Sequence, residues 1–554
     1  MLISNRFASL VRVLAGVSSM VRTLALACGF LLVALPAASG RDVEPPPAGA
    51  ATFVVTGHGW GHGVGFSQYG AYGYAQKGFG YAKIILHYFP GTTLGDAPVS
   101  RVRVLLTSGV KSLKLGAAED FRVRDGSGAV HDVVAGAYTL TPALKLKVDG
   151  EDKAKALPPP LLFQPAGGSL ELKRRYRGSI QIDVVSGRLR AINVVGLEQY
   201  LYGVVPSEMP NTWHPEALKA QAVAARSYAL ATRKIGPFDL YPDTRSQVYL
   251  GIDHEKPSTT AAVDATAGKV LLFEGQVAKT FFFSTSGGRT ASAEDVWGKP
   301  VPYLVSVPDP YDSISPYHNW GPFAFTGAKL ARVLKMSGRV LDLRPELNSS
   351  GRIETLTVVG TKGSVSVPGN DLRRRLGLRS TWFSVGVLSL NAPPAAVVYG
   401  SRARLTGIAR GVPQAVLQQR DGSAWDEVGA AKADRTGAVS FVVKPATTTR
   451  YRLASGKVTA PPVRVPVAPL IRFYPTRTLD QLRGYVRPRS LAGARVVIQR
   501  QQGEGWLTLA QTTVADDANF LARLQLSTGV YRARVSSGHG YVTGTSPVLQ
   551  VSSS

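Results

Sequence analysis

One acidic side chain, Glu208, lies in a stretch whose residue types could perform acid catalysis. Pro206 and Pro210 flank it closely. Because each proline fixes its own φ and disfavours helix in the residue before it, we expect a stiff, non-helical corner at Glu208. Val204 and Met209 are apolar neighbours. Partial desolvation would raise the pKa of the carboxyl group and suit it to act as a general acid. The alternative is an ordinary surface carboxylate.

A helix should follow this corner and carry two basic residues. Pro215 stands where a first helical residue is favoured, and apolar residues repeat at three- and four-residue spacing from Leu218 to Ala229. Lys219 and Arg226 are seven residues apart, so they share one face of this helix. They could bind a substrate carboxylate or stabilise developing charge. The alternative is a solvated face.

Two blocks carry a resemblance to a known family. Residues 198–210 read EQYLYGVVPSEMP, and residues 216–229 read EALKAQAVAARSYA. Both closely resemble the SpoIID/LytB family, in which the core E-Y-L-x-G-V-V-x-x-E-M-P precedes this helix. The resemblance implies a lytic transglycosylase that cuts peptidoglycan glycan strands, with Glu208 as its catalytic acid. It also associates Lys219 and Arg226 with activity.

A lytic transglycosylase needs only one carboxyl group, which protonates the glycosidic oxygen and then accepts the proton of the muramic acid 6-hydroxyl. Glycoside hydrolases normally need two carboxyl groups across the bond. Glu198, ten residues before Glu208, could be a second one. We interpret it instead as an acid that begins or caps a helix.

A glycine-rich block lies near the beginning of the chain. Residues 57–71 read GHGWGHGVGFSQYGA, with glycine at alternate positions, so the backbone is bare and can adopt positive φ. This block also resembles the family, which usually has it last, and a circular permutation accounts for the order. We therefore expect it to pack beside residues 370–387. His62 and Gln68 are predicted to hydrogen-bond in the substrate groove, with a purely structural loop as the alternative.

A second small-residue loop, FFSTSGGRT at residues 282–290, also matches the family. Ser286, Gly287 and Gly288 supply N–H donors and are predicted to lie at the substrate wall. Some family members place His and Cys in this loop and bind zinc, whereas this chain has Ser284 and Ser286. No metal and no cofactor is expected.

The remaining chain is predicted to be mostly strand. Short alternating runs at about residues 100–190 indicate a β-rich subdomain. From about residue 395 an internal repeat at an offset of 77 to 81 residues indicates two immunoglobulin-like sandwiches. Trp425 and Trp506 occupy equivalent positions and are interpreted as core residues. Basic residues such as Arg483 could give wall affinity, and a spacer role is the alternative.

The predicted organisation therefore combines an α+β catalytic domain with all-β repeats. The predicted boundaries are a signal peptide at 1–40, a SpoIID/LytB-like catalytic domain at 52–390, and β-sandwich repeats at 395–465 and 470–552. The signal peptide has basic residues before an apolar run that is too short to span a membrane comfortably. An uncleaved anchor is the alternative, and it would be the only link to a membrane.

Net charge indicates an anionic partner outside the cell. The chain carries +27, or +24 without the three arginines of the signal peptide. Cell-wall polymers fit this charge and compartment, whereas nucleic acid is not expected as a partner. The only cysteine, Cys28, falls in the signal peptide, so no disulfide is expected.

Two functions follow from these patterns. The first is an exported, envelope-located lytic transglycosylase that acts on peptidoglycan glycan strands, with peptide-stripped strands as the expected substrate. The second is a non-catalytic amidase enhancer that binds the wall and stimulates a wall amidase. A wall-anchored adhesin is a third reading, which depends only on the C-terminal repeats.

Overall fold

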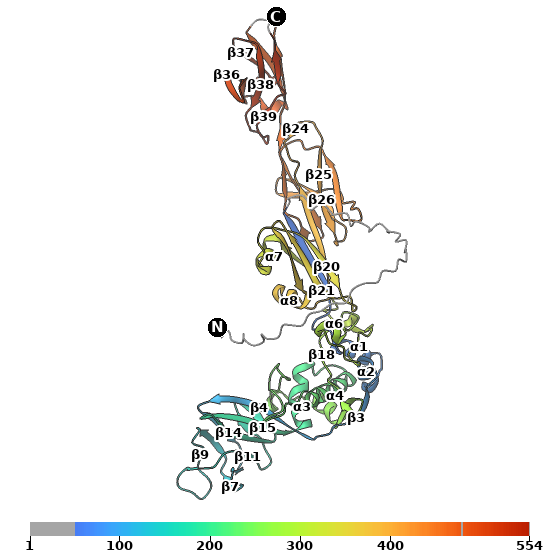
Figure 1. The fold of residues 1–554 in the computed structure, drawn as a ribbon, viewed down its shortest axis with the longest axis vertical. Coiled ribbons are helices and arrows are strands. Elements are labelled where there is room, and N and C mark those ends of the chain that lie inside the picture. The colour runs from blue at the N-terminus through green and yellow to red at the C-terminus, as the bar shows by residue number, and fades with distance from the viewer. Residues whose placement is uncertain (1–49, 478–479, 553–554) are drawn as a thin grey trace, which may run out of the picture. The chain divides into compact units, whose positions relative to one another are not determined.

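The computed structural model describes residues 50–477 and 480–552, so the predicted signal peptide lies outside the described residues. The described chain is strand-rich, with many separate sheets and few helices (Figure 1). Within these ranges, no helix has both the length and the apolar character that a membrane span requires.

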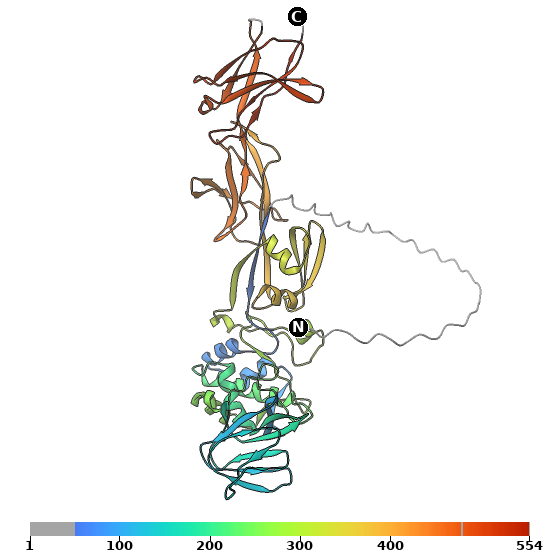
Figure 2. The ribbon, with the colours of Figure 1, turned by 90° about the vertical axis from the view of Figure 1, so that its left-hand side faces the viewer.

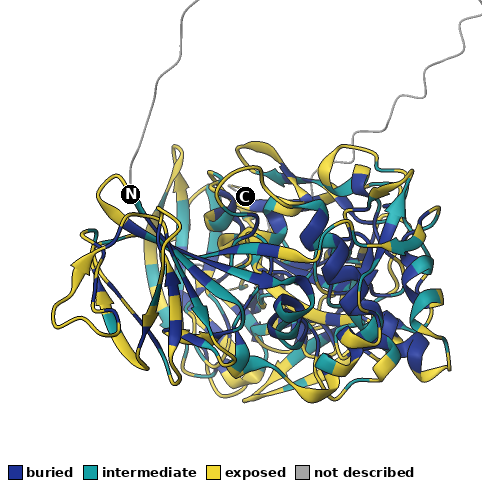
Figure 3. Cartoon of the chain, turned by 90° about the horizontal axis from the view of Figure 1, so that it is seen from below, coloured by how far each residue is buried: buried dark blue, intermediate teal, exposed yellow. Residues whose placement is uncertain are grey.

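One buried helix, α4 (Pro215–Ala231), organises the helical part. It begins at Pro215 as predicted, and the His214 side chain caps it by accepting a hydrogen bond from the Glu216 N–H. Its many alanines let four neighbours approach closely. Figure 3 shows buried residues gathered in the interior and exposed residues at the periphery. The neighbours are α1 (Gln68–Gln76), α2 (Tyr81–Tyr88), α3 (Leu197–Glu208) and α5 (Pro257–Asp264).

The predicted non-helical corner at Glu208 is wrong. Glu208 is the last residue of helix α3, which includes Pro206. The apolar side chains of α3 are buried, and this packing outweighs the local preference of a proline in the last turn. Pro210 then holds Met209 in an extended conformation, so the helix ends here.

The glycine-rich N-terminal block completes a sheet built from much later residues. Strand β1 (Ala51–His58) lies antiparallel between β19 (Asn319–Thr326) and β23 (Phe383–Asn391). In Figure 2 it is the blue strand among yellow ones. Ala51 pairs with Ser389 in this register. The predicted packing beside residues 370–387 is confirmed.

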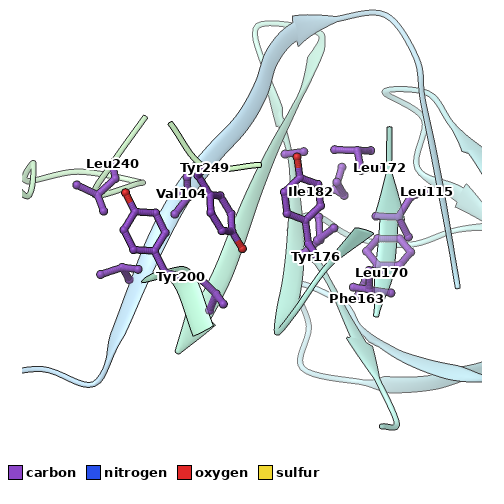
Figure 4. Packing of buried hydrophobic residues seen from close by; sticks show 14 of the residues in the cluster. Val104, Leu115, Phe163, Leu170, Leu172, Tyr176, Ile182, Tyr200, Leu240 and Tyr249 are labelled. Atoms are coloured by element: carbon purple, nitrogen blue, oxygen red, sulfur yellow. The ribbon is translucent and has the colours of Figure 1, made fainter. Parts of the chain in front are cut away.

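The predicted β-rich subdomain consists of strands as expected. One sheet has the order β4-β15-β14-β11-β6-β7, and another has the order β13-β12-β5-β8. Their bounds are β4 (Arg101–Val110), β5 (Leu113–Ala117), β6 (Phe121–Arg124), β7 (Val130–Val133), β8 (Gly136–Leu140), β11 (Leu161–Pro165), β12 (Leu170–Leu172), β13 (Arg174–Tyr176), β14 (Ser179–Val185) and β15 (Arg188–Gly196). Three tyrosines, Tyr176, Tyr249 and Tyr200, continue this core into helix α3 (Figure 4).

Strands with two further helices fill residues 319–391. Strands β20 (Val340–Leu347), β21 (Ile353–Gly360) and β22 (Gly363–Pro368) form an antiparallel sheet. Helices α7 (Gly327–Leu334) and α8 (Gly369–Leu376) bury their apolar faces in the same core as β1.

Beyond residue 391 two sheet pairs follow, each around its own core. We call them the first and second C-terminal sheet pairs. In the first pair, β25 and β28 extend the sheet that contains β1 and β23. The second sheet of this pair has the order β27-β26-β29-β30. The second contains β33-β34-β37 and β36-β35-β38-β39. The bounds are β25 (Ala403–Arg410), β26 (Val416–Asp421), β27 (Ala424–Ala430), β28 (Ala438–Val443), β29 (Thr449–Ser455), β30 (Val458–Thr459), β33 (Leu470–Pro475), β34 (Gln481–Arg487), β35 (Arg495–Gln502), β36 (Gly505–Thr513), β37 (Asn519–Arg523), β38 (Gly529–Val535) and β39 (Gly544–Thr545).

The interpretation of Trp425 and Trp506 as core residues is wrong. Both are only partly buried, and an arginine side chain stacks on each ring. Both belong to strands at a sheet edge, β27 and β36, where a large ring can lie on the outer face. Their equivalence in the repeat is real, but it concerns a surface feature.

Candidate functional site

Glu208 is a half-buried carboxylate at the end of helix α3. Burial raises its pKa from 4.5 to about 7, and a hydrogen bond from the Val248 backbone N–H opposes this shift. No charged group contributes to the shift. Two phenols lie close enough to feel its charge: burial, and to a lesser extent Glu208, raises the pKa values of Tyr200 and Tyr228. Near neutral pH such a carboxyl group is protonated in part and can donate a proton.

Gln68 brings the glycine-rich block directly to this helix end. Its Nε2 donates to the backbone oxygen of Glu208 at 3.0 Å and to Gln221 Oε1 at 3.2 Å. Gln68 begins helix α1, which Ser67 caps through the Gly70 N–H. The sequence-predicted pair Glu208 and Gln68 is therefore brought together, from positions 140 residues apart.

Aromatic rings lie on helix α1, on the connection after α3 and in the glycine-rich block. Trp213, in the connection between α3 and α4, packs on Tyr69 and Tyr72 with centroid separations of 4.6 Å each. Trp60 is 40% exposed and meets Tyr317 edge-on at 4.4 Å. Partly exposed rings of this kind can stack on the apolar faces of sugars.

His62 does not reach toward a substrate. The Val64 N–H donates to its Nδ1 at 3.1 Å, and its Nε2 lies 3.2 Å from the Phe282 carbonyl oxygen. Burial lowers the pKa of His62 to about 4. Because both ring nitrogens have partners inside the protein, the structure favours the structural alternative for His62.

The loop of Ser286, Gly287 and Gly288 is likewise occupied internally. The N–H groups of Ser286 and Gly287 donate to the two Asp312 carboxylate oxygens at 2.9 Å each, and the Gly288 N–H donates to Ser286 Oγ at 3.0 Å. These donors cannot also bind a ligand, which corrects their predicted role at a substrate wall. Backbone donors of this kind satisfy the oxygens of a buried carboxylate.

The predicted contact of Arg226 with a substrate carboxylate does not fit its position in the structure. Its side chain is fully buried and pairs with Glu198, while Nη1 donates to the Lys269 carbonyl oxygen at 3.0 Å. It therefore positions helix α4 against α3 and does not contact substrate. Glu198 lies in the first turn of α3, as expected for an acid that begins a helix, but α3 has no side-chain cap, and the partner of Glu198 is this arginine.

Lys219 differs from Arg226 although both lie on helix α4. Its side chain is 27% exposed, and Nζ is 2.7 Å from Glu216 Oε1. The structure thus separates two residues that the seven-residue spacing placed on one face. Only Lys219 retains access to solvent.

Sequence reasoning missed a second acidic cluster, made by Asp309 and Asp312. Asp312 accepts from the Ser67 hydroxyl at 3.1 Å and lies 3.0 Å from His318 Nδ1. Asp309 accepts from the Tyr88 hydroxyl at 2.8 Å. Gly70 is required here, because a Cβ at that position would lie 2.2 Å from the Asp309 carboxylate. The only sequence signal was two acids in an otherwise apolar and small-residue neighbourhood.

No metal centre is formed by the part of the chain that the structure describes: no three His, Cys, Asp or Glu side chains gather there as ligands. A cavity of about 930 Å³ lies away from Glu208, in the β-rich subdomain, lined by residues of β4, β5, β8, β12 and β13.

Comparison with known proteins places the helix pair in a family. Residues 185–273, which include α3 and α4, match the family model described as "Stage II sporulation protein" (SpoIID). This segment of the chain is therefore similar to the SpoIID/LytB family. The chain is 34% identical over 224 residues to Stage II sporulation protein D of Bacillus subtilis. The aligned residues cover 37% of this chain and 64% of that protein. The chain is 43% identical over 113 residues to the Bacillus subtilis amidase enhancer, covering 20% of this chain and 15% of that protein.

The chain thus spans less than two thirds of either SpoIID/LytB relative. Among solved structures, the two fibronectin type III domains of chicken tenascin align with 30% of this chain at 14% identity and a TM-score of 0.19. A likeness at that score supports no inference about function.

Proposed function

We propose that this protein is a peptidoglycan lytic transglycosylase in which Glu208 is the acid and then the base. The observation that carries the proposal is the half-buried Glu208 carboxyl group, with a pKa of about 7, beside Gln68 of the glycine-rich block. A group with this pKa has both protonation states available at neutral pH, as a residue that first donates and then accepts a proton requires.

The reaction proceeds in two proton transfers. Protonated Glu208 donates to the glycosidic oxygen that follows muramic acid, and the bond from that oxygen to C1 breaks. The resulting carboxylate then removes the proton of the muramic 6-hydroxyl, whose oxygen closes on C1. The product has a 1,6-anhydro end, no water is consumed, and Glu208 is protonated again. Only one carboxyl group is needed, which agrees with the engagement of Glu198 by Arg226.

The finer assignments belong to the same proposal. Residues 52–390 act as an α+β catalytic domain, with the β-rich subdomain as part of it, and residues 395–465 and 470–552 act as immunoglobulin-like modules. The substrate is the glycan strand with its peptides removed, since each muramic acid then carries a free carboxylate for which Lys219 is the remaining cationic candidate. The protein is exported to the envelope and uses no cofactor.

A second candidate function rests on the similarity to the amidase enhancer. In that case the SpoIID domain would bind the wall and stimulate an amidase without cleaving glycan. Glu208 would then matter for binding or not at all.

Purified protein and peptide-stripped glycan strands separate the two functions. The transglycosylase predicts fragments with anhydro ends, which disappear for Glu208→Gln while the folded protein persists. The enhancer predicts strand binding without fragments, together with faster peptide release when a wall amidase is added. Gln was chosen because it keeps the shape of the side chain and removes the proton.

A further inference from the structure

The two C-terminal sheet pairs carry the same arrangement of three side chains on their outer faces. In the first pair, Arg452 of β29 stacks over the Trp425 ring of β27 with its guanidinium carbon 4.0 Å from the ring centroid. Its Nε donates to Gln418 Oε1 of β26 at 2.8 Å. The strands β27, β26 and β29 are neighbours in one sheet, labelled in part in Figure 1.

The second pair repeats this arrangement with the same distances. Arg532 of β38 lies 4.0 Å from the Trp506 ring of β36, and its Nε donates to Gln499 Oε1 of β35 at 2.8 Å. In both pairs the glutamine is the direct cross-strand partner of the arginine. We call each set a Gln-Arg-Trp ladder.

Each ladder holds a guanidinium group in place and leaves its outer edge free. Ring stacking and the Nε hydrogen bond fix the plane of the group, so little side-chain entropy remains to be lost on binding. Among the described residues the hydrogen bond of each arginine is made by Nε, and neither arginine forms an ion pair with an acid. A fixed planar edge with two nitrogens matches the two oxygens of a carboxylate or phosphate.

The surroundings of both ladders are cationic. Arg420 lies 6.0 Å from the Trp425 ring, and it contributes with burial to a lowered pKa of Arg452. Arg534 acts in the same way on Arg532. An anion placed between such neighbours would relieve their repulsion. Residues 391–554 as a whole carry 21 Lys and Arg against 8 Asp and Glu, a net charge of +13.

A shallow pocket adjoins the second ladder. It has a volume of about 330 Å³ and is lined by Arg495, Arg534, Gln499, Gln511 and Thr508, among others. These residues lie on the same outer face of the sheet as Trp506 and Arg532, because they belong to alternate positions of neighbouring strands. Arginines combined with amide and hydroxyl groups offer donors for both charged and hydroxyl oxygens of a sugar polymer.

We propose that the two Gln-Arg-Trp ladders bind an anionic glycan. Its carboxylate or phosphate groups would be held by Arg452 and Arg532, and its sugar hydroxyls by the neighbouring amides and hydroxyls. A polymer is favoured over a small anion, since two equal elements in one chain gain affinity only from a ligand with repeated charges. This binding site is separate from Glu208 and does not depend on the proposed cleavage.

The test is a binding measurement with the full chain in the Glu208→Gln background, so that no strand is consumed. The probes are peptide-stripped glycan strands, which carry carboxylates, a phosphate-linked polysaccharide, which carries phosphates, and neutral chitin oligomers. We expect both charged polymers to bind and chitin to bind at least about tenfold more weakly. A tighter Kd for one charged polymer identifies the natural charge.

The decisive variant is Arg452→Gln with Arg532→Gln. Its matched control is Arg404→Gln with Arg472→Gln, which removes two exposed arginines from the opposite sheets of the same pairs and so leaves the net charge equal. We expect the ladder variant to weaken binding about tenfold or more and the control to weaken it less than about threefold. Lys at both ladder positions should give an intermediate loss, because it keeps the charge without the planar edge.

Three results would overturn the proposal. Equal losses in the ladder and control variants would mean that only diffuse charge acts. Chitin binding as tight as the charged glycans would exclude recognition of the anion. Tighter binding of a DNA oligonucleotide, with the same loss in the ladder variant, would identify a nucleic acid as the partner instead. Unchanged far-ultraviolet circular dichroism and Tm are the folding controls, and the Lys variant keeps the test valid if the Gln variant unfolds.

Discussion

Glu208 and Asp309 are two carboxyl groups with similar proton affinity and different access. Burial raises the pKa of each to about 7, and for Asp309 the charge of Asp312 adds to this effect. Glu208 remains partly exposed at a helix end, whereas Asp309 is enclosed with the Tyr88 hydroxyl. A raised pKa therefore identifies a desolvated acid, and only access to substrate makes such an acid a candidate for catalysis.

The largest effect expected from this contrast concerns Asp312. Replacing Asp312 with Ala would leave the N–H groups of Ser286 and Gly287 and the Ser67 hydroxyl unsatisfied in the interior. We expect a loss of about 3–5 kcal/mol in the free energy of unfolding, measured by urea denaturation. Asp371→Ala, which removes an exposed pair with Arg374, should cost less than about 1 kcal/mol. Similar losses in both variants would contradict the structural role of the cluster.

A smaller effect is expected in the way that stability depends on pH. Because folding raises the pKa of Glu208 above its unfolded value, its contribution to stability is present below pH 4.5 and lost as the pH rises through about 7. As the pH rises from 4 to 8.5, the free energy of unfolding of Glu208→Gln should therefore increase by about 1–3 kcal/mol relative to that of the wild type. Asp309→Asn should gain in the same direction, since its pKa is raised too.

Only one of these two variants should lose glycan cleavage. Asp309→Asn is expected to retain the wild-type rate within about fivefold, because Asp309 is not exposed to substrate. Glu151→Gln is the control for the stability series, since its exposed carboxylate has a lowered pKa and so the opposite sign. A pH-independent stability difference for Glu208→Gln would show that the carboxyl group is fully solvated.

The smallest effect is expected at Gln68. Gln68→Ala removes the hydrogen bond to the Glu208 backbone oxygen, which contributes about 1 kcal/mol. As Gln68 is a positioning residue, we expect kcat to fall up to about tenfold while KM and the pH midpoint of the rate stay unchanged. A shifted midpoint would mean that Gln68 acts on the proton affinity of Glu208 instead.

The sequence predicted local features well where one short motif determines them. Helix α4 begins at Pro215, and the glycine-rich block packs beside β23. Proline chemistry and a long motif match suffice for such predictions. At Glu208 the same proline rules failed, because burial of the α3 face outweighed them.

The side-chain roles could not be predicted because they depend on distant partners. Arg226 is engaged by Glu198 and His62 by Phe282, and neither pairing leaves a trace in residue spacing. The buried Asp312 determines that the loop at Ser286 is structural, across 26 residues. The Gln-Arg-Trp ladders likewise depend on strand register, which places Gln418 opposite Arg452 and Gln499 opposite Arg532 and is not given by the spacing of the repeat.

The most direct test of the central claim is the rate of anhydro-ended product formation from peptide-stripped strands between pH 5 and pH 9. The account predicts a rate that falls about tenfold per pH unit above pH 7 as Glu208 loses its proton, and a loss of at least about a thousandfold in Glu208→Gln at every pH. Anhydro ends formed by Glu208→Gln at the wild-type rate would contradict it.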